Sequence, residues 1–236
     1  MRILITRPLD DARETAAKLK ALGHEAIIAP LLEIRFRDGA ELNLENVQAI
    51  LATSANGVRA LARRTTRRDI PVFAVGPQTS EAARLAGFAD VKSADGDADA
   101  LVEATAKWAK SGAGALFHAQ GEQTKGGLAK SLAARGFEIR IEILYEAVAA
   151  SALPQQAVDA LKAGALDAVF HFSPRSARVF AECVARAGLT HTIQPLTALC
   201  ISKAAAEALA PLKFREIRIA ARPDQEAMFA LVSGGL

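Results

Sequence analysis

The sequence predicts an α/β protein built from two similar domains with parallel sheets. Short runs of Ile, Val and Leu alternate along its 236 residues with Ala-rich segments of helical spacing, which is typical of successive βα units. A strand–turn–helix pattern at residues 47–64 returns at residues 169–180, with Ser54 and Ser173 at equivalent positions. A repeat of this length indicates two copies of one fold.

Composition restricts the class of protein further. The apolar content of 51% and the charged content of 23% are typical of a globular protein in water. No apolar run approaches the roughly 20 residues that span a bilayer, and no signal-peptide pattern opens the chain. We therefore expect a cytoplasmic location and no membrane partner. Cys183 and Cys200 form neither a disulfide framework nor a metal motif, so we expect both to be buried.

The charge distribution favours a small anionic ligand over nucleic acid. A net charge of +3 without a long basic stripe is too small to indicate nucleic acid binding. The arginines at 63, 64, 67 and 68 cluster locally, as is usual for a solvated helix end. A modest positive field still favours organic anions.

The elements expected from apolar periodicity and from Gly, Pro and capping residues follow one another along the whole chain. The expected strands are residues 2–8, 25–29, 30–36, 47–51, 71–75, 88–93, 115–121, 138–144, 167–172, 196–201 and 215–220. The expected helices are residues 10–22, 58–64, 80–86, 95–108, 151–164, 202–209 and 225–232, with two more after residues 121 and 173.

Local signals justify the elements of the first half. Asp10 or Asp11 can cap the first helix, and Gly23 suits its end, where a positive φ is favoured. Residues 30–36 are extended because proline disfavours helix in the residue before it. The acidic loop at residues 95–99 lacks the spacing and closing Glu of an EF-hand, so we expect it to cap a helix and to bind no Ca²⁺.

The second half repeats the parts of the first half in the same order. Gly136 follows a helix as Gly23 does, and the same offset places Gln120 at Arg7 and Gly121 at Pro8. The chain then reads as A–B–A′–B′, where A is a βαβ unit and B is three βα units. We expect residues 1–34 with 151–236 to form domain 1, residues 38–144 to form an inserted domain 2, and residues 35–37 with 145–150 to form a two-stranded linker. A cleft between domains is the expected ligand site.

Polar turns follow almost every expected strand. Ligands of open parallel sheets bind beyond the carboxyl ends of the strands, and hydroxyls and helix N-termini there bind carboxylate or phosphate. No dinucleotide, Walker or nucleophile-elbow motif is present, and each serine taken alone is better explained as a helix cap. The candidate binding residues are Arg7, Thr53, Ser54, Asn56, Gly76, Thr79, Gly121, Ser173, Arg175, Ser176 and Ser202.

Histidine and tyrosine add one candidate proton donor and no metal site. His24, His118, His171 and His191 lack metal-ligand spacing, and His171 is expected to be a hydrogen-bonded core or edge residue. Tyr145 is the only tyrosine and lies where the chain is expected to cross between domains. Its phenol could donate a proton in a cleft, or its ring could simply pack in the core.

Several motifs together resemble the uroporphyrinogen-III synthase family over residues 1 to about 232. They are ITRP at 5–8, the segment 19–24, PLLEI at 30–34, TSANGV at 53–58, AVGPQT at 74–79, LY at 144–145 and FSPRS at 172–176.

The resemblance implies two flavodoxin-like domains joined by a two-stranded ladder, with the active site in the cleft. It implies cyclisation of hydroxymethylbilane to uroporphyrinogen III, with loss of water, inversion of ring D and no cofactor. An azafulvenium cation and a spiro intermediate are the expected species, and much of the catalysis is orientation. The substrate carries acetate and propionate groups, which suit hydroxyls and helix N-termini.

The resemblance also assigns roles to residues. Tyr145, matching the family's tyrosine, would assist departure of the substrate hydroxyl. The hydroxyls and backbone amides of the polar turns after the strands would bind the substrate carboxylates. Arg7 and Arg175 could add positive charge. Ala205 stands where many relatives have threonine, which leaves Ser202 as a substitute binding residue. We expect a monomer, with transient contact with hydroxymethylbilane synthase as a further option.

Two other functions remain open from the residues alone. A non-catalytic two-domain protein that binds an organic polyanion would share every cleft feature but would need no proton donor. A nucleotide-sugar transferase is less well supported, because no charged diphosphate site is visible.

Overall fold

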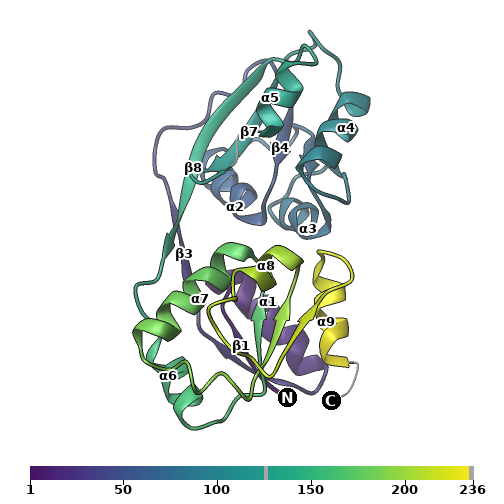
Figure 1. Ribbon diagram of the computed structural model, residues 1–236. Helices are drawn as coiled ribbons and strands as arrows, with labels where there is room; N and C mark the ends of the chain where they lie inside the picture. The colour runs from purple at the N-terminus through teal and green to yellow at the C-terminus, as the bar shows by residue number, and fades with distance from the viewer. Residues whose placement is uncertain (125–126, 234–236) are drawn as a thin grey trace. The chain divides into compact units, whose positions relative to one another are not determined.

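The computed structural model describes residues 1–124 and 127–233, which fold into two compact units (Figure 1). Unit 1 contains Met1–Glu33 and the chain from Val148 onward, and unit 2 is the continuous segment Ile34–Ala147. These limits differ by one to four residues from those of the two expected domains.

Unit 1 contains a five-stranded parallel sheet in the order β11-β10-β9-β1-β2. Its elements are β1 (Arg2–Ile5), α1 (Leu9–Ala21), β2 (Glu25–Ile28), α6 (Gln155–Lys162), β9 (Ala168–His171), α7 (Pro174–Arg186), β10 (Thr197–Cys200), α8 (Lys203–Glu207), β11 (Glu216–Ile219) and α9 (Gln225–Ser233). The central strands β1, β9 and β10 are buried except at Arg2, because helices cover both faces of the sheet.

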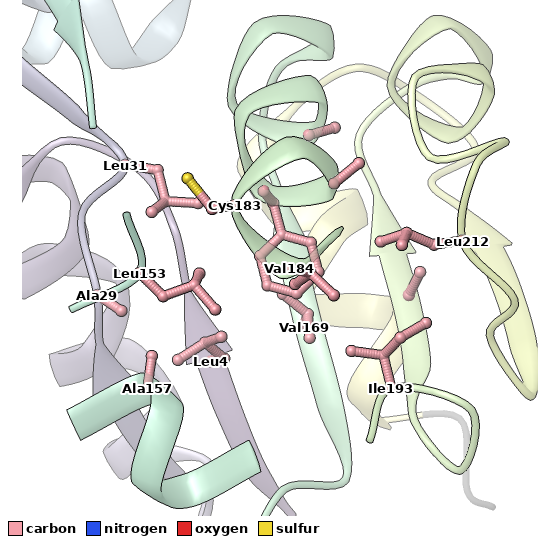
Figure 2. Packing of buried hydrophobic residues seen from close by; sticks show 14 of the residues in the cluster. Leu4, Ala29, Leu31, Leu153, Ala157, Val169, Cys183, Val184, Ile193 and Leu212 are labelled. Carbon is pink, nitrogen blue, oxygen red and sulfur yellow. The ribbon is translucent and has the colours of Figure 1, made fainter. Parts of the chain in front are cut away.

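Two apolar clusters hold the helices of unit 1 to its sheet. Leu4, Val169 and Val184 belong to a cluster that joins one face to α6, α7 and α8, and Figure 2 shows their side chains among its members. Ile5 and Met228 belong to the cluster on the opposite face, which joins the sheet to α1 and α9. Alternate side chains along each strand therefore pack against the helix layers on opposite faces of the sheet.

Unit 2 contains a six-stranded sheet in the order β3-β8-β7-β4-β5-β6. Its elements are β3 (Leu32–Phe36), β4 (Val47–Ala52), α2 (Ala55–Arg64), β5 (Val72–Ala74), α3 (Pro77–Leu85), β6 (Val91–Ser93), α4 (Ala98–Trp108), β7 (Ala115–Gly121), α5 (Gly127–Ala133) and β8 (Ile139–Ala149). The strands β4 to β8 form parallel pairs.

The edge strand β3 lies beside β8 in the opposite direction. The Arg37 N–H donates to the Leu144 carbonyl at 2.8 Å, and the Ala150 N–H donates to the Leu31 carbonyl at 3.0 Å. Both points at which the chain passes from one unit to the other fall within β3 and β8.

Helices also cover both faces of the unit 2 sheet. Val58 and Ala83 place α2 and α3 against one face. Leu101 and Leu132 place α4 and α5 against the other. The α/β class with two parallel sheets, expected from the sequence, is confirmed.

The two sheets share one spatial order with different chain connections. Unit 1 reads β2-β1-β9-β10-β11, which is the flavodoxin-like order 2-1-3-4-5. Without its edge strand, unit 2 reads β8-β7-β4-β5-β6, which is the same order if β7 and β8 are counted first. Unit 2 is thus a circular permutation of unit 1.

Some helix limits differ from those expected. Helix α3 begins at Pro77 and not at residue 80, because proline fits the first helical position, where no N–H is needed. Helix α6 begins at Gln155 and not at residue 151, because Pro154 holds an extended backbone at the N-cap. Cys183 and Cys200 are buried, as expected. No helix within residues 1–124 and 127–233 is long and apolar enough to cross a membrane.

Candidate functional site

Each sheet has a switch point, where the chain leaves two neighbouring strands in opposite directions. In unit 2 this point lies between β4 and β7, and in unit 1 between β1 and β9. Ligands of doubly wound sheets bind at such points because the connecting loops diverge there. Thr53 and Ser54 directly follow β4, and Gly121 ends β7. Arg7 follows β1 and Ser173 follows β9 at the corresponding point of unit 1.

Ser54 connects the first turn of α2 to the only tyrosine. Its Oγ, at the N-cap of α2, accepts a hydrogen bond from the Gly57 N–H at 3.0 Å and so satisfies one otherwise unpaired donor of the helix. The same Oγ lies 2.8 Å from Oη of Tyr145 in β8. The half-buried phenol is therefore hydrogen-bonded at the N-terminus of α2.

Gly121 provides the space for the tyrosine ring. Gly121 and Tyr145 are register partners on β7 and β8. A Cβ at Gly121 would lie 2.7 Å from Cζ and 3.0 Å from Oη of Tyr145, closer than such atoms approach in practice. The lack of a side chain lets the ring lie against β7 and reach Ser54 beyond it.

Gly57 lets the first turn of α2 approach β7. A Cβ there would lie 2.8 Å from the carbonyl oxygen of Ala119, so any side chain would push the helix away from the strand. Gly57 was not among the site residues expected from the sequence. The available signal was a glycine three residues after a capping serine, on the buried face of the helix.

Thr53 contacts His118, a buried histidine that was not expected as a site residue. Thr53 Oγ1 and His118 Nε2 are 3.4 Å apart, and His118 Nδ1 has no hydrogen-bond partner among the described residues. Burial lowers the pKa of His118 to about 4, because the charged ring would lose its hydration. At neutral pH the ring is uncharged and supports the Thr53 hydroxyl as a neutral partner.

The other candidates of unit 2 lie in the first turns of α2 and α3. Asn56 Oδ1 accepts a hydrogen bond from Arg59 at 2.8 Å. Gly76 is the N-cap of α3, and its carbonyl accepts from the N–H and the hydroxyl of Ser80, each at 3.0 Å. Thr79 is buried in the same turn. The extended backbone of Gly76 is open to any residue, and an added Cβ would meet only Gly96 O at 3.9 Å.

Arg7 is buried inside unit 1. Its guanidinium lies 3.5 Å from the Asp11 carboxylate, donates to Thr15 Oγ1 at 3.1 Å and to Gln225 Oε1 at 3.4 Å, and stacks 4.1 Å from the Phe172 ring centroid. These contacts join the end of β1 to α1 and α9. The Arg7 charge is thus already balanced by a buried carboxylate.

The serine candidates of unit 1 cap helices. Ser173 Oγ accepts from the Ser176 N–H at 3.1 Å and lies 3.0 Å from Ser176 Oγ. Arg175 is half-buried in the same turn. Ser202 caps the short α8 by accepting from the Ala205 N–H at 3.3 Å. The two equivalent capping serines therefore differ in their second partner, which is a serine in unit 1 and the tyrosine in unit 2.

The structure brings Tyr145, Ser54 and Gly121 into direct contact and joins Thr53 to His118. No group of three His, Cys, Asp or Glu side chains that could hold a metal ion occurs among residues 1–124 and 127–233. Burial raises the pKa of the Cys200 thiol to about 12, so this thiol stays protonated and is a poor nucleophile. The titratable side chain in direct contact with Ser54 is the Tyr145 phenol.

Fold and site together define a class. The chain is a doubly wound α/β protein of two repeated units, with capping hydroxyls at both switch points and one phenol in unit 2. The family model described as uroporphyrinogen-III synthase HemD matches residues 13–230. The chain belongs to this family.

Known proteins similar to this chain agree with that assignment. A Methanocaldococcus jannaschii protein described as a candidate uroporphyrinogen-III synthase is 38% identical over 69 residues, which is 29% of this chain and 29% of that relative. The crystal structure of uroporphyrinogen-III synthetase from Helicobacter pylori has 15% identity, a TM-score of 0.62 and coverage of 99% of both chains. A mutant uroporphyrinogen III synthase from the extremely thermophilic bacterium Thermus thermophilus has 18% identity and a TM-score of 0.54, covering 99% of this chain and 97% of its own. These structural similarities support the fold.

Proposed function

We propose that the chain has the activity of its family, as a cyclising lyase that converts hydroxymethylbilane to uroporphyrinogen III with loss of water. The family match over residues 13–230 supports the reaction. The observation that carries the proposal for the site is the hydrogen bond between Tyr145 and the capping Ser54 at the switch point of unit 2.

Tyr145 is the proposed catalytic residue. Departure of the terminal hydroxyl requires a proton, and a phenol near the leaving oxygen can donate one. The azafulvenium cation that remains attacks the substituted position of ring D, and the resulting spiro intermediate rearranges so that ring D closes inverted. Without an enzyme the chain closes head to tail, so holding one conformation is the larger part of the task. The proposed chemistry uses no cofactor.

The substrate carboxylates are proposed to bind at the helix N-termini of both switch points. N–H groups and the positive ends of helices favour anions, and capping hydroxyls can turn toward a ligand. The proposed binding residues are Arg7, Thr53, Ser54, Asn56, Gly76, Thr79, Gly121, Ser173, Arg175, Ser176 and Ser202. Among these, the buried Arg7 is proposed to act by fixing the end of β1 through its bonds to α1 and α9.

The domain organisation is part of the same proposal. Residues 1–34 with 151–236 and residues 38–144 act as two domains, the segments 35–37 and 145–150 join them as a two-stranded connector, and the substrate binds in a cleft between them. The candidate binding residues that follow the carboxyl ends of strands in both sheets support this arrangement. A monomeric cytoplasmic enzyme, with transient contact with hydroxymethylbilane synthase, completes it on the strength of the resemblance.

A coupled assay tests the function. The purified chain receives freshly generated hydroxymethylbilane, and the oxidised porphyrin isomers are separated by chromatography. We expect isomer III, the product with ring D inverted, in place of isomer I, the product of head-to-tail closure, without added nucleotide or metal. Tyr145→Phe keeps the ring and removes the hydroxyl, so we expect kcat to fall by about 10²-fold or more. Isomer I alone from folded protein would reject the synthase and favour the binding protein.

A further inference from the structure

The Tyr145 phenol belongs to a short chain of hydrogen bonds that runs into helix α2. Oη lies 2.8 Å from Ser54 Oγ, and Ser54 Oγ accepts from the Gly57 N–H at 3.0 Å. A serine hydroxyl has one proton to donate and two lone pairs. Because the Gly57 N–H occupies one lone pair, the Ser54 proton remains available to the phenol oxygen.

We propose that Ser54 is a positioning residue that donates its hydroxyl proton to Tyr145 and stabilises the phenolate formed during the reaction. The inference rests on the proposed synthase function. For Ser54 it replaces the carboxylate-binding role expected from the sequence and proposed above, because in the structure the Ser54 Oγ contacts the phenol.

The proton balance of the proposed step is simple. The bond between the terminal carbon and its hydroxyl oxygen breaks, and the electron pair stays on the oxygen, which takes the phenol proton and leaves as water. Tyr145 remains as phenolate and the tetrapyrrole as an azafulvenium cation. After ring closure, one proton lost from the cyclised tetrapyrrole restores the phenol.

Ser54 favours this step because its bond to the phenol strengthens as charge develops. Hydrogen bonds to an anionic acceptor are about twice as strong as those between neutral groups, and only interactions that are stronger in the transition state raise kcat. The Gly57 N–H polarises the Ser54 hydroxyl, and the positive end of α2 favours negative charge nearby. The acceptor-only phenolate leaves Ser54 no role except donor.

The equivalent serine of unit 1 provides a matched comparison. Ser173 caps α7 as Ser54 caps α2, and the Ser176 N–H donates to it at 3.1 Å. Its second hydroxyl partner is Ser176, at 3.0 Å. Removing the Ser173 hydroxyl therefore removes the same kind of cap without removing a bond to the phenol.

Because the chain contains a single tyrosine, its titration can be followed by ultraviolet absorbance without any substrate. We expect Ser54→Ala to lower the acid dissociation constant of the phenol about tenfold, which raises the titration midpoint by about one pH unit. Ser54→Asp keeps the cap but cannot donate when ionised, so its midpoint should rise at least as much. Ser54→Thr should retain the wild-type midpoint, and Ser173→Ala should titrate like wild type.

Kinetics provide the second measurement. We expect Ser54→Ala to lower kcat about tenfold with little change in KM, and Ser54→Thr to restore kcat. An unchanged midpoint in both Ser54→Ala and Ser54→Asp, with circular dichroism showing folded protein, would overturn the proposal. Equal shifts in Ser54→Ala and Ser173→Ala would also overturn it. If wild-type protein makes no isomer III, the proposed function fails, while the titration still decides whether Ser54 donates to Tyr145.

Discussion

The position of the Tyr145 ring depends on the absence of a side chain at Gly121. The two residues are register partners, and a Cβ at Gly121 would lie 2.7 Å from Cζ of the ring. The ring is the mobile end of a side chain, whereas the strand backbone is fixed by its ladder. A substitution at Gly121 would therefore displace the phenol and leave the fold intact.

We predict that Gly121→Ala moves the phenol away from Ser54 and lowers kcat by about 10- to 100-fold, because small displacements of a catalytic group cost rates of this order. Steady-state formation of isomer III measures the effect, and circular dichroism verifies the fold. Gly127→Ala is the matched control, since a Cβ there meets no atom within 4 Å, and it should retain wild-type kcat. Equal rates in both variants would show that the ring position does not limit the reaction.

The contact between Ser54 and Tyr145 was not predictable from the sequence. The two residues are 91 positions apart, and their contact depends on the register of β7 with β8, which is irregular between Gln120 and Gly121. Residue spacing alone was compatible with Tyr145 as a core residue or as a cleft residue.

For His171 the expectation was half right. The ring is buried, but among the described residues neither of its nitrogens has a hydrogen-bond partner.

At the scale of elements, the packing of α2 on β7 sets the height of the helix above the sheet. Gly57 faces the Ala119 carbonyl, and a Cβ would lie 2.8 Å from that oxygen. Unlike the tyrosine ring, this carbonyl belongs to a paired strand between β4 and β8 and cannot turn aside.

We predict that Gly57→Ala lowers the free energy of unfolding by about 1–3 kcal/mol, the usual cost of overpacking, and also lowers kcat because Ser54 moves with the helix. Urea unfolding followed by Trp108 fluorescence, which reports on unit 2, measures the first effect. Gly127→Ala, also in the first turn of a helix, should be neutral or slightly stabilising. Unchanged stability in Gly57→Ala would mean that α2 can shift at little cost.

Element identities were largely predictable because local chemistry specifies them. Ser54, Ser173 and Ser202 all cap helices, as serine does after a strand. Three helix starts were wrong because proline takes the first helical or capping position: Pro77 opens α3, Pro154 is the N-cap of α6, and Pro8 is the N-cap of α1 in place of Asp10 or Asp11. Proline is compatible with both a turn and a helix start, so the pattern alone could not separate the two.

At the scale of the whole molecule, each unit contains one buried neutral histidine. Burial lowers the pKa of His171 to about 3 and that of His118 to about 4, from an ordinary value of 6.5. His171 lies between the rings of Phe180 and Phe214. When the chain unfolds below pH 6.5, both rings gain protons that the folded state excludes, so stability falls as the pH falls.

We predict a loss of about 1.4 kcal/mol per pH unit for each histidine between pH 6.5 and about 4, measured by urea unfolding at several pH values. His171→Leu removes one titrating group and two unpaired nitrogens. It should therefore stabilise unit 1 by about 1–2 kcal/mol at pH 7 and by more at pH 5. A wild-type slope in His171→Leu would contradict the prediction.

The two units share a scaffold but differ in their chemistry. The offset that relates Gly23 to Gly136 places Leu32 at the position of Tyr145 and Pro8 at that of Gly121. Leu32 is buried in the apolar cluster of unit 1. The phenol and the glycine that makes room for it thus occur together in unit 2, and both are missing at the equivalent places of unit 1.

The order of strands in unit 1 also has a consequence during synthesis of the chain on the ribosome. Strand β1 is central, between β2 and β9, yet β2 ends at Ile28 and β9 begins at Ala168, roughly 140 residues later. At about 5–20 residues per second, one edge of β1 stays unpaired for on the order of 10–30 s, until β9 has been synthesised. All strands of the permuted sheet emerge during that interval, so the nascent chain must keep Ile3, Leu4 and Ile5 from aggregating while another sheet forms.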